Sequence, residues 1–213
     1  MKMKWITPIG LLAAFMLWTV AVCFVDVAPI GPNGSVVGFA AVNGWFHRLT
    51  GVNMTLYALT DWLGLVPVAV CLGFAILGLC QWINRRTIRK VDADILLLGG
   101  FYILTIAAYL IFESVVVNYR PVLIHGYLEA SYPSSTTLLT LCVMSTAWIQ
   151  WHRRLRHPTL RHLVIAVTIA FAVFMVVGRV ISGVHWLTDV VGGILLSGTL
   201  VTFYVALCRT MTK

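Results

Sequence analysis

The stretch from residue 178 to residue 193 places an arginine, a histidine and an aspartate between two apolar runs, in a chain of which only 10% of the residues are charged. Ionisable side chains at membrane depth are costly and indicate function. His185 and Asp189 are four residues apart, so they share one face if the second run is helical from about His185 onward. The aspartate would then orient the imidazole, and Arg179 would offer a planar fork of donors to a phosphate or a carboxylate. A buried ion pair between two helices explains these three residues equally well at this stage.

The composition is typical of an integral membrane protein. Of the 213 residues, 60% are hydrophobic, which predicts a single domain, residues 1–213, whose core is a membrane bundle. The net charge of +8 comes from short loops between apolar runs rather than from a basic stripe, which argues against a nucleic-acid partner. The five cysteines form no Cys-x-x-Cys pair, so we interpret them as small hydrophobic residues and predict no metal site.

The apolar runs predict an all-α fold of six transmembrane helices. A helix needs roughly 20 apolar residues to span the hydrocarbon core, and six stretches qualify or nearly do: about 6–27, 54–83, 94–118, 135–151, 163–181 and 185–207. The first is interpreted as an uncleaved span rather than a signal peptide. Residues 28–53 are too short and too mixed to span, and predict an external interfacial helix after a turn-rich linker. The second run contains Asp61 and Pro67, so we expect it either to begin outside the bilayer or to kink at the proline.

The basic residues predict the orientation. With six spans, twelve of the fifteen Lys and Arg residues and both termini fall on one side of the membrane. Cytoplasmic loops carry an excess of Lys and Arg, so we expect this side to be cytoplasmic. The twelve residues are Lys2, Lys4, Arg85, Arg86, Arg89, Lys90, Arg153, Arg154, Arg156, Arg161, Arg209 and Lys213. The other three, Arg48, Arg120 and Arg179, fall on the external side. We therefore expect a multi-pass protein of the cell membrane.

The external loop 119–134 ends in what looks like a helix start. Pro133 cannot continue a preceding helix, and Ser134, Ser135 and Thr136 are good caps with free backbone N–H groups behind them. Such a start can bind an anion. It lies on the same side of the membrane as the arginine, histidine and aspartate of residues 178–193.

In this order and topology the chain resembles the type-two phosphatidic acid phosphatase family, the lipid phosphate phosphatases related to vanadium haloperoxidases. The usual motifs of that family are Lys-x6-Arg-Pro, Pro-Ser-Gly-His and Ser-Arg-x5-His-x3-Asp. Here they correspond to Arg120-Pro121, to Pro133-Ser134-Ser135, and to Arg179, His185 and Asp189 at the same spacing, with Gly178 in place of the serine. The resemblance covers residues 94–193.

The resemblance implies the role of each residue. His185 would attack phosphorus to give a phosphohistidine, and Asp189 would orient it. Arg120 and Arg179 would hold the phosphoryl oxygens, joined by Ser134 and by backbone N–H groups at the helix start, including that of Ser135. Phosphoryl transfer needs mainly positioning and stabilisation of spread negative charge, so no metal or other cofactor is expected.

Two positions depart from the family pattern. Thr136 stands where the family has the histidine that protonates the leaving oxygen, and Glu113 stands where the first motif has lysine. A general acid is typically worth about 10²–10⁴-fold. Three features could compensate: His125 in the same external loop, Glu113 itself as an acid if its environment raises its pKa, or a diphosphate lipid such as undecaprenyl diphosphate, whose leaving group hardly needs a proton.

The sequence therefore supports a membrane phosphatase of lipid phosphates or lipid diphosphates, whose partners are its substrate and the membrane lipids. The alternative is a catalytically impaired relative that binds or carries lipid phosphates. A phosphotransferase that passes the phosphoryl group to another acceptor also fits these residues. Oligomeric state and chain specificity have no signal in the sequence.

Overall fold

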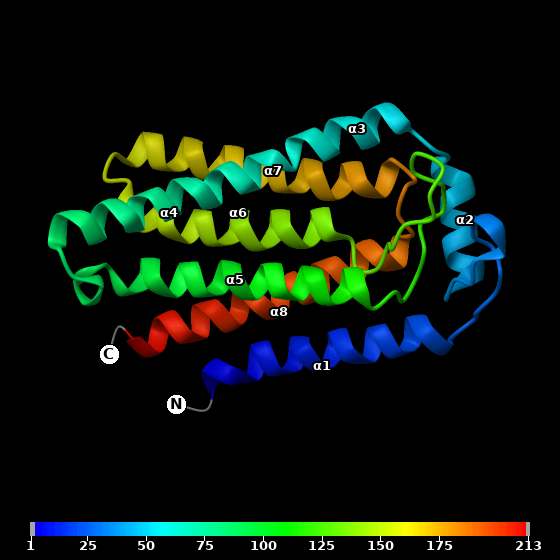
Figure 1. Cartoon of the computed structure of the whole chain (residues 1–213), viewed down its shortest axis with the longest axis horizontal. Helices are drawn as coiled ribbons and strands as arrows, with labels where there is room; N and C mark the ends of the chain where they lie inside the picture. Colours follow the sequence, from blue (N-terminus) through cyan, green and yellow to red (C-terminus); the bar gives the residue numbers. More distant parts are fainter. Residues whose placement is uncertain (1–2, 212–213) are drawn as a thin grey trace.

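The computed structural model describes residues 3–211, which are helical throughout apart from loops and isolated bridges. Figure 1 shows long helices running side by side, with α2 lying across one end. The elements are α1 Met3–Phe24, α2 Ala40–Thr50, α3 Met54–Leu63, α4 Leu65–Arg85, α5 Ala93–Ser114, α6 Ser135–Arg154, α7 Pro158–Ile181 and α8 Leu187–Met211, with 3₁₀ turns at Pro32–Gly34 and Ile88–Lys90. The all-α fold class is confirmed. Lys2 and Lys213, which entered the orientation argument, lie outside the described residues.

Five helical segments in residues 3–211 are long and apolar enough to cross a membrane: Lys4–Phe24, Met54–Arg85, Ala93–Ser114, Pro158–Ile181 and Leu187–Met211. They carry large apolar side chains on the outside of the bundle, such as Leu17 and Ile103, each 71% exposed. A soluble protein rarely exposes so much apolar surface, whereas lipid would cover it.

The fourth predicted span, 135–151, corresponds to α6, which is not among these five and differs from the other long helices. It packs against α7 and α8 and also contacts α4 and α5, so it lies inside the bundle. Its polar residues Thr140, Thr146 and Gln150 are completely buried, and they lower its hydropathy below that of a simple span. A membrane-spanning role for α6 stays a prediction.

The second predicted span, 54–83, consists of two helices that meet at Gly64. The N–H of Gly64 donates to the carbonyls of Thr60 and Asp61 at 3.1 and 3.0 Å, and a Cβ at this position would lie 2.8 Å from the Asp61 carbonyl oxygen. Pro67 falls in the first turn of α4, where its missing N–H costs no helical hydrogen bond. The helix therefore breaks three residues before the proline that the sequence indicated.

The helix predicted within 28–53 is α2, and a buried asparagine ties it to α8. Asn43 Nδ2 donates to Thr188 Oγ1 at 2.9 Å, and the Thr188 N–H donates back to Asn43 Oδ1 at 3.3 Å. This pair holds α2 across the start of α8. Its location at a membrane interface stays a prediction.

The two ends of the bundle differ in charge. At the end where α1 begins and α8 finishes, here called the terminal end, Arg154 pairs with Asp92 at 3.1 Å and with Asp94 at 2.8 Å, joining the ends of α5 and α6. Lys4 Nζ donates to the Arg209 carbonyl at 2.7 Å in the same region. The opposite end, here called the site end, holds the loop between α5 and α6 and the turn between α7 and α8.

Candidate functional site

His185 lies in the short connection between α7 and α8, where it is only 4% exposed. Its Nε2 is 3.3 Å from Arg120 Nη1, and its Nδ1 is 3.2 Å from Ser131 Oγ. The sequence predicts a helix from about His185 onward, but α8 begins at Leu187. The histidine and Asp189 are therefore brought together by the chain turn that precedes the helix rather than by a shared helical face.

Asp189 is completely buried in the first turn of α8, and each of its oxygens accepts hydrogen bonds. Oδ1 accepts from Asn118 Nδ2 at 3.2 Å, while Oδ2 accepts from the Trp186 N–H at 2.9 Å and from the Ser131 hydroxyl. The direct distance from His185 Nδ1 to Asp189 Oδ2 is 3.9 Å, beyond a hydrogen bond. Ser131 is thus the hydrogen-bonding link between the two.

These contacts assign the tautomer of the imidazole. Arg120 has donors only, so Nε2 must be the acceptor in its contact with Arg120 and carries no proton. Ser131 gives its own proton to Asp189, so its oxygen accepts from Nδ1–H. The chain of donors runs from His185 through Ser131 to Asp189. It puts the basic lone pair of the imidazole on Nε2, which would become a nucleophile once the hydrogen bond from Arg120 shifts to a bound anion.

The surroundings keep this imidazole neutral. Burial lowers the pKa of His185 well below its usual value, and the positive charges of Arg120 and Arg179 lower it further. A group with a lowered pKa loses its proton at lower pH than usual. The histidine is therefore deprotonated at neutral pH, as a nucleophile must be.

Arg179, near the end of α7, is 1% exposed and has donors without partners. Its Nη2 donates to Asp61 Oδ1 at 2.8 Å and to Thr136 Oγ1 at 2.5 Å. Its Nε and Nη1 are buried and make no hydrogen bond with any described residue. Buried donors normally find acceptors, so this guanidinium fits a bound anion with several oxygens.

Arg120 is the second guanidinium at the site end, and Tyr57 faces both. The Arg120 Nε is 3.1 Å from Glu129 Oε2, and the Arg120 N–H donates to the Glu129 carbonyl at 3.0 Å. The Tyr57 ring centre lies 5.9 Å from the Arg120 guanidinium carbon and 4.9 Å from that of Arg179. Tyr57 therefore lies within cation–π range of both arginines.

The start of α6 is held against α8 by close backbone approach. The Ser134 N–H donates to the Asp189 carbonyl at 2.9 Å, and Ser134 Oγ accepts from Thr137 Oγ1 at 3.1 Å. A Cβ at Gly192 would lie 2.5 Å from the Tyr132 ring, so only glycine allows the loop to come this close. Ser134 is completely buried and points into this packing.

Of the other predicted site residues, two line a pocket with His185 and one lies away from it. Ser135 and Glu113 line a small pocket together with His185 and Ser131. His125 lies elsewhere, at the exposed tip of the turn between Ile124 and Tyr127, and in residues 3–211 it makes no hydrogen bond or ion pair with the cluster.

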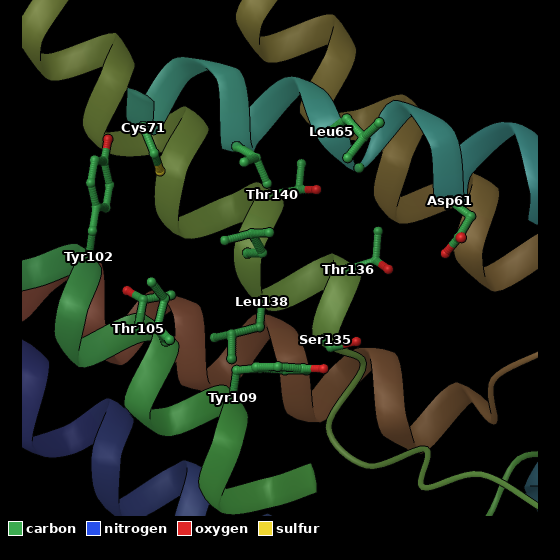
Figure 2. Close-up of a pocket in the computed structure, with 14 residues that line it drawn as sticks. Asp61, Leu65, Cys71, Tyr102, Thr105, Tyr109, Ser135, Thr136, Leu138 and Thr140 are labelled. Atoms are coloured by element: carbon green, nitrogen blue, oxygen red, sulfur yellow. The ribbon is translucent and has the colours of Figure 1, made fainter. Parts of the chain in front are cut away.

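A cavity of about 480 Å³ begins beside Arg179 and extends between α4, α5 and α6. Figure 2 shows Asp61 and Thr136 at one end of this cavity and Cys71 and Tyr102 at the other. Its remaining lining is largely apolar, with Leu65 and Leu138 among the side chains. Ser135, Tyr109 and Leu138 line both this cavity and the small pocket at His185, so the two spaces adjoin.

Several residues of the site carry little or no signal in the sequence. Asn118 and Ser131 lie in the irregular external loop and had no spacing signal, although both are buried polar residues. Tyr57 carries no signal of its own in an apolar run. Asp61 did have one, because it is an ionisable residue inside that run, but its partner 118 residues away could not be inferred.

The class defined by this fold and site is a helical membrane protein with a buried, unprotonated histidine beside Arg120 and within the electrostatic reach of Arg179. The sequence model of the PAP2 superfamily matches residues 109–212, which contain Arg120, the start of α6 and the histidine motif. The match confirms the family resemblance. Comparison with curated proteins gave no match.

The fold comparison agrees with this assignment. The chain is similar to the crystal structure of the first transmembrane PAP2 type phosphatidylglycerolphosphate phosphatase from Bacillus subtilis, with 20% identity and a TM-score of 0.57 over 96% of each chain. This chain therefore has the fold of a PAP2-type membrane phosphatase over almost its whole length.

Proposed function

We propose that this protein is an integral membrane phosphatase that removes phosphate from lipid phosphates or lipid diphosphates through a phosphohistidine on His185. The observation that carries the proposal is the arrangement around this side chain. Its unprotonated Nε2 lies 3.3 Å from the Arg120 guanidinium, and the positive charge of Arg179, whose Nε and Nη1 are buried donors without partners among the described residues, also acts on this histidine. A nucleophile between two cations suits attack on phosphorus.

The reaction has two steps on the same nitrogen. In the first, the Nε2 lone pair attacks phosphorus and the bond to the leaving oxygen breaks, while Nδ1–H remains bonded to Ser131 and the positive charge is balanced by Asp189. In the second, water attacks phosphorus, the P–N bond breaks and orthophosphate leaves. The two arginines would stabilise the charge on the phosphoryl oxygens in both steps.

The lipid part of the substrate is assigned to the cavity beside Arg179. Its apolar lining suits an acyl or prenyl chain, and its polar end at Asp61 and Thr136 adjoins the arginine that would hold the phosphate. A lipid could therefore place its phosphate at His185 and its chain between α4, α5 and α6. This arrangement supports a lipid rather than a small soluble phosphate ester as the substrate.

The identity of residue 136 supports a preference for diphosphate lipids. Thr136 donates no proton to a leaving alkoxide at neutral pH, and its hydroxyl oxygen is already taken by Arg179. The leaving group of a lipid diphosphate is a phosphate ester of low pKa, which departs without a proton. We therefore expect undecaprenyl diphosphate to be a better substrate than phosphatidic acid or phosphatidylglycerophosphate.

Phosphate release measured on these three lipids with purified protein tests the proposal. We expect release from the diphosphate and none from the His185→Ala variant. Thr136→His should raise release from phosphatidic acid, because it adds a proton donor on the leaving-group side. A wild-type protein that prefers phosphatidic acid contradicts the diphosphate preference, and release that survives His185→Ala contradicts the phosphohistidine.

We further propose that the site faces the external side. This follows from the basic residues at the terminal end and the rule that cytoplasmic loops carry the excess of Lys and Arg. A membrane-impermeant maleimide should label Gly126→Cys in intact cells but not Arg89→Cys, with the unsubstituted chain as the background control. The reverse labelling pattern contradicts the orientation.

A further inference from the structure

Helix α3 lies outside the family match, yet it supplies two side chains to the two arginines. Tyr57 and Asp61 are one turn apart and therefore share one face of α3. Tyr57 faces both guanidinium groups, and Asp61 pairs with Arg179 at 2.8 Å. The chemistry assigned to residues 109–212 is therefore completed by a helix from the N-terminal half.

The position of α3 is fixed by its packing on the end of α7. The Asn53 N–H donates to the Ser182 carbonyl at 2.9 Å, and Asn53 Oδ1 accepts from the Leu56 N–H and so caps the helix. A Cβ at Gly178 would lie 2.7 Å from Thr60 Cγ2, so the glycine lets α3 approach closely. Contacts at the start of α3 and at Thr60, the residue before Asp61, thus hold Asp61 next to Arg179.

Asp61 combines an ion pair to Arg179 with an exposed side chain, on the side of the site where Thr136 lies. Its side chain is 60% exposed, whereas that of Asp189 is fully buried with both oxygens engaged. Glu129 is paired with the other arginine. Glu113 is also exposed, but it lines the small pocket from α5 and, among the described residues, forms no ion pair with either arginine. Asp61 and Thr136, in contrast, share one nitrogen of Arg179.

Only Oδ1 of Asp61 takes the bond to Arg179, and in residues 3–211 no donor reaches Oδ2. An exposed carboxylate oxygen next to a phosphate-binding arginine is well placed to accept a proton from a water molecule. Asp61 also lies beside Thr136, and the hydroxyl of Thr136 cannot take up that proton. The site as described by its motifs lacks such an acceptor.

We propose that Asp61 is the general base that activates the water hydrolysing the phosphohistidine, an inference that rests on the proposed function. In this step the water oxygen forms a bond to phosphorus, its proton passes to Asp61 Oδ2, and the P–N bond breaks. The electron pair of that bond returns to Nε2, which restores the neutral imidazole. Orthophosphate leaves, and the Asp61 proton passes to solvent through its exposed face.

This role agrees with a diphosphate substrate. The leaving group of a lipid diphosphate departs without a proton, so the first step needs no proton from Asp61, which can stay ionised. Only the second step needs a base, and a general base typically contributes about 10²–10⁴-fold. Loss of Asp61 should therefore slow the second step far more than the first.

The test is rapid-quench kinetics with a lipid diphosphate labelled at its terminal phosphate. Wild-type protein and Asp61→Asn, which keeps an oxygen for Arg179, are compared. We expect steady-state release by the variant to fall about 10²-fold, while the labelled phosphoprotein forms at close to the wild-type rate and accumulates. Hydroxylamine, a stronger nucleophile than water, should discharge it. Asp61→Glu should restore part of the turnover without accumulation.

Equal slowing of both steps, with no accumulated phosphoprotein, would show that Asp61 only positions Arg179 and would overturn the inference. Unchanged turnover would overturn it as well. Inhibition by orthophosphate, measured on both proteins, reports whether the variant keeps the anion site. A wild-type protein that neither releases phosphate nor becomes labelled overturns the proposed function itself, whereas an active wild type with an unlabelled Asp61→Asn variant overturns only the role of Asp61.

Discussion

Removing the Ser131 hydroxyl tests the site with a single substitution, because this hydroxyl is the hydrogen-bonding link between His185 and Asp189. Replacing it by alanine removes the acceptor 3.2 Å from Nδ1 and leaves the carboxylate 3.9 Å away, too far for a direct bond. The imidazole then loses the group that fixes its tautomer, and Asp189 loses one of its donors. Ser131→Ala should therefore reduce nucleophilicity without touching either arginine.

The size of the effect follows from the bond that is lost. A hydrogen bond to a charged group contributes about 1.5–3 kcal/mol, which corresponds to about 10- to 150-fold in rate. We expect kcat/KM for lipid diphosphate to fall by a factor within that range in Ser131→Ala. The thermal midpoint in detergent should fall as well, because a buried carboxylate loses a donor, so kcat/KM is compared at a temperature where both proteins are folded.

The matched control is Ser197→Ala, a buried serine of α8 whose hydroxyl donates only to the Ile194 carbonyl of its own helix. It should keep kcat/KM within about twofold, as expected for a site with no contact to the reacting groups. A Ser131→Ala protein with the same kcat/KM as this control would refute the reasoning, because it would show that His185 needs no link to Asp189.

Two further predictions concern charge and packing at the site. Burial lowers the pKa of His185, and the charge of Arg120 lowers it further. Arg120→Gln should therefore raise this pKa and move the acid limb of the pH profile of kcat/KM to higher pH. An unmoved acid limb would show that the titration of His185 does not set that limb. Gly192→Ala would place a Cβ 2.5 Å from the Tyr132 ring, which should cost about 1–3 kcal/mol of stability and lower activity, as read from thermal unfolding and phosphate release. Gly198→Ala, in the same helix with its nearest neighbour at 3.6 Å, should change neither, and equal effects of the two substitutions would contradict the packing argument.

The parts of the site that the sequence predicted are those set by local order along the chain. The spacing of Arg179, His185 and Asp189 was sufficient, because the turn between α7 and α8 brings these three residues to one end of the bundle. The basic loops also fall at the terminal end, as a six-helix order requires. Helix α8 begins two residues after His185, because Asp189 Oδ2 accepts a hydrogen bond from the Trp186 N–H and so caps the helix there.

The remaining parts depend on contacts between distant segments. Ser131 and Asn118 reach Asp189 through an irregular loop whose path no periodic pattern encodes. Asp61 meets Arg179 only because α3 packs on α7. The buried polar residues of α6 likewise make sense only inside a bundle, where neighbouring helices cover them.

The central claim is that His185 carries the phosphoryl group, and trapping that intermediate tests it most directly. Protein incubated with lipid diphosphate labelled at the terminal phosphate, then denatured rapidly, should retain label that is lost in acid and stable in base, as a phosphohistidine is. Peptide mapping should place the label on His185, and His185→Ala should retain none. Label on another residue, or phosphate release by His185→Ala at the wild-type rate, would contradict the account.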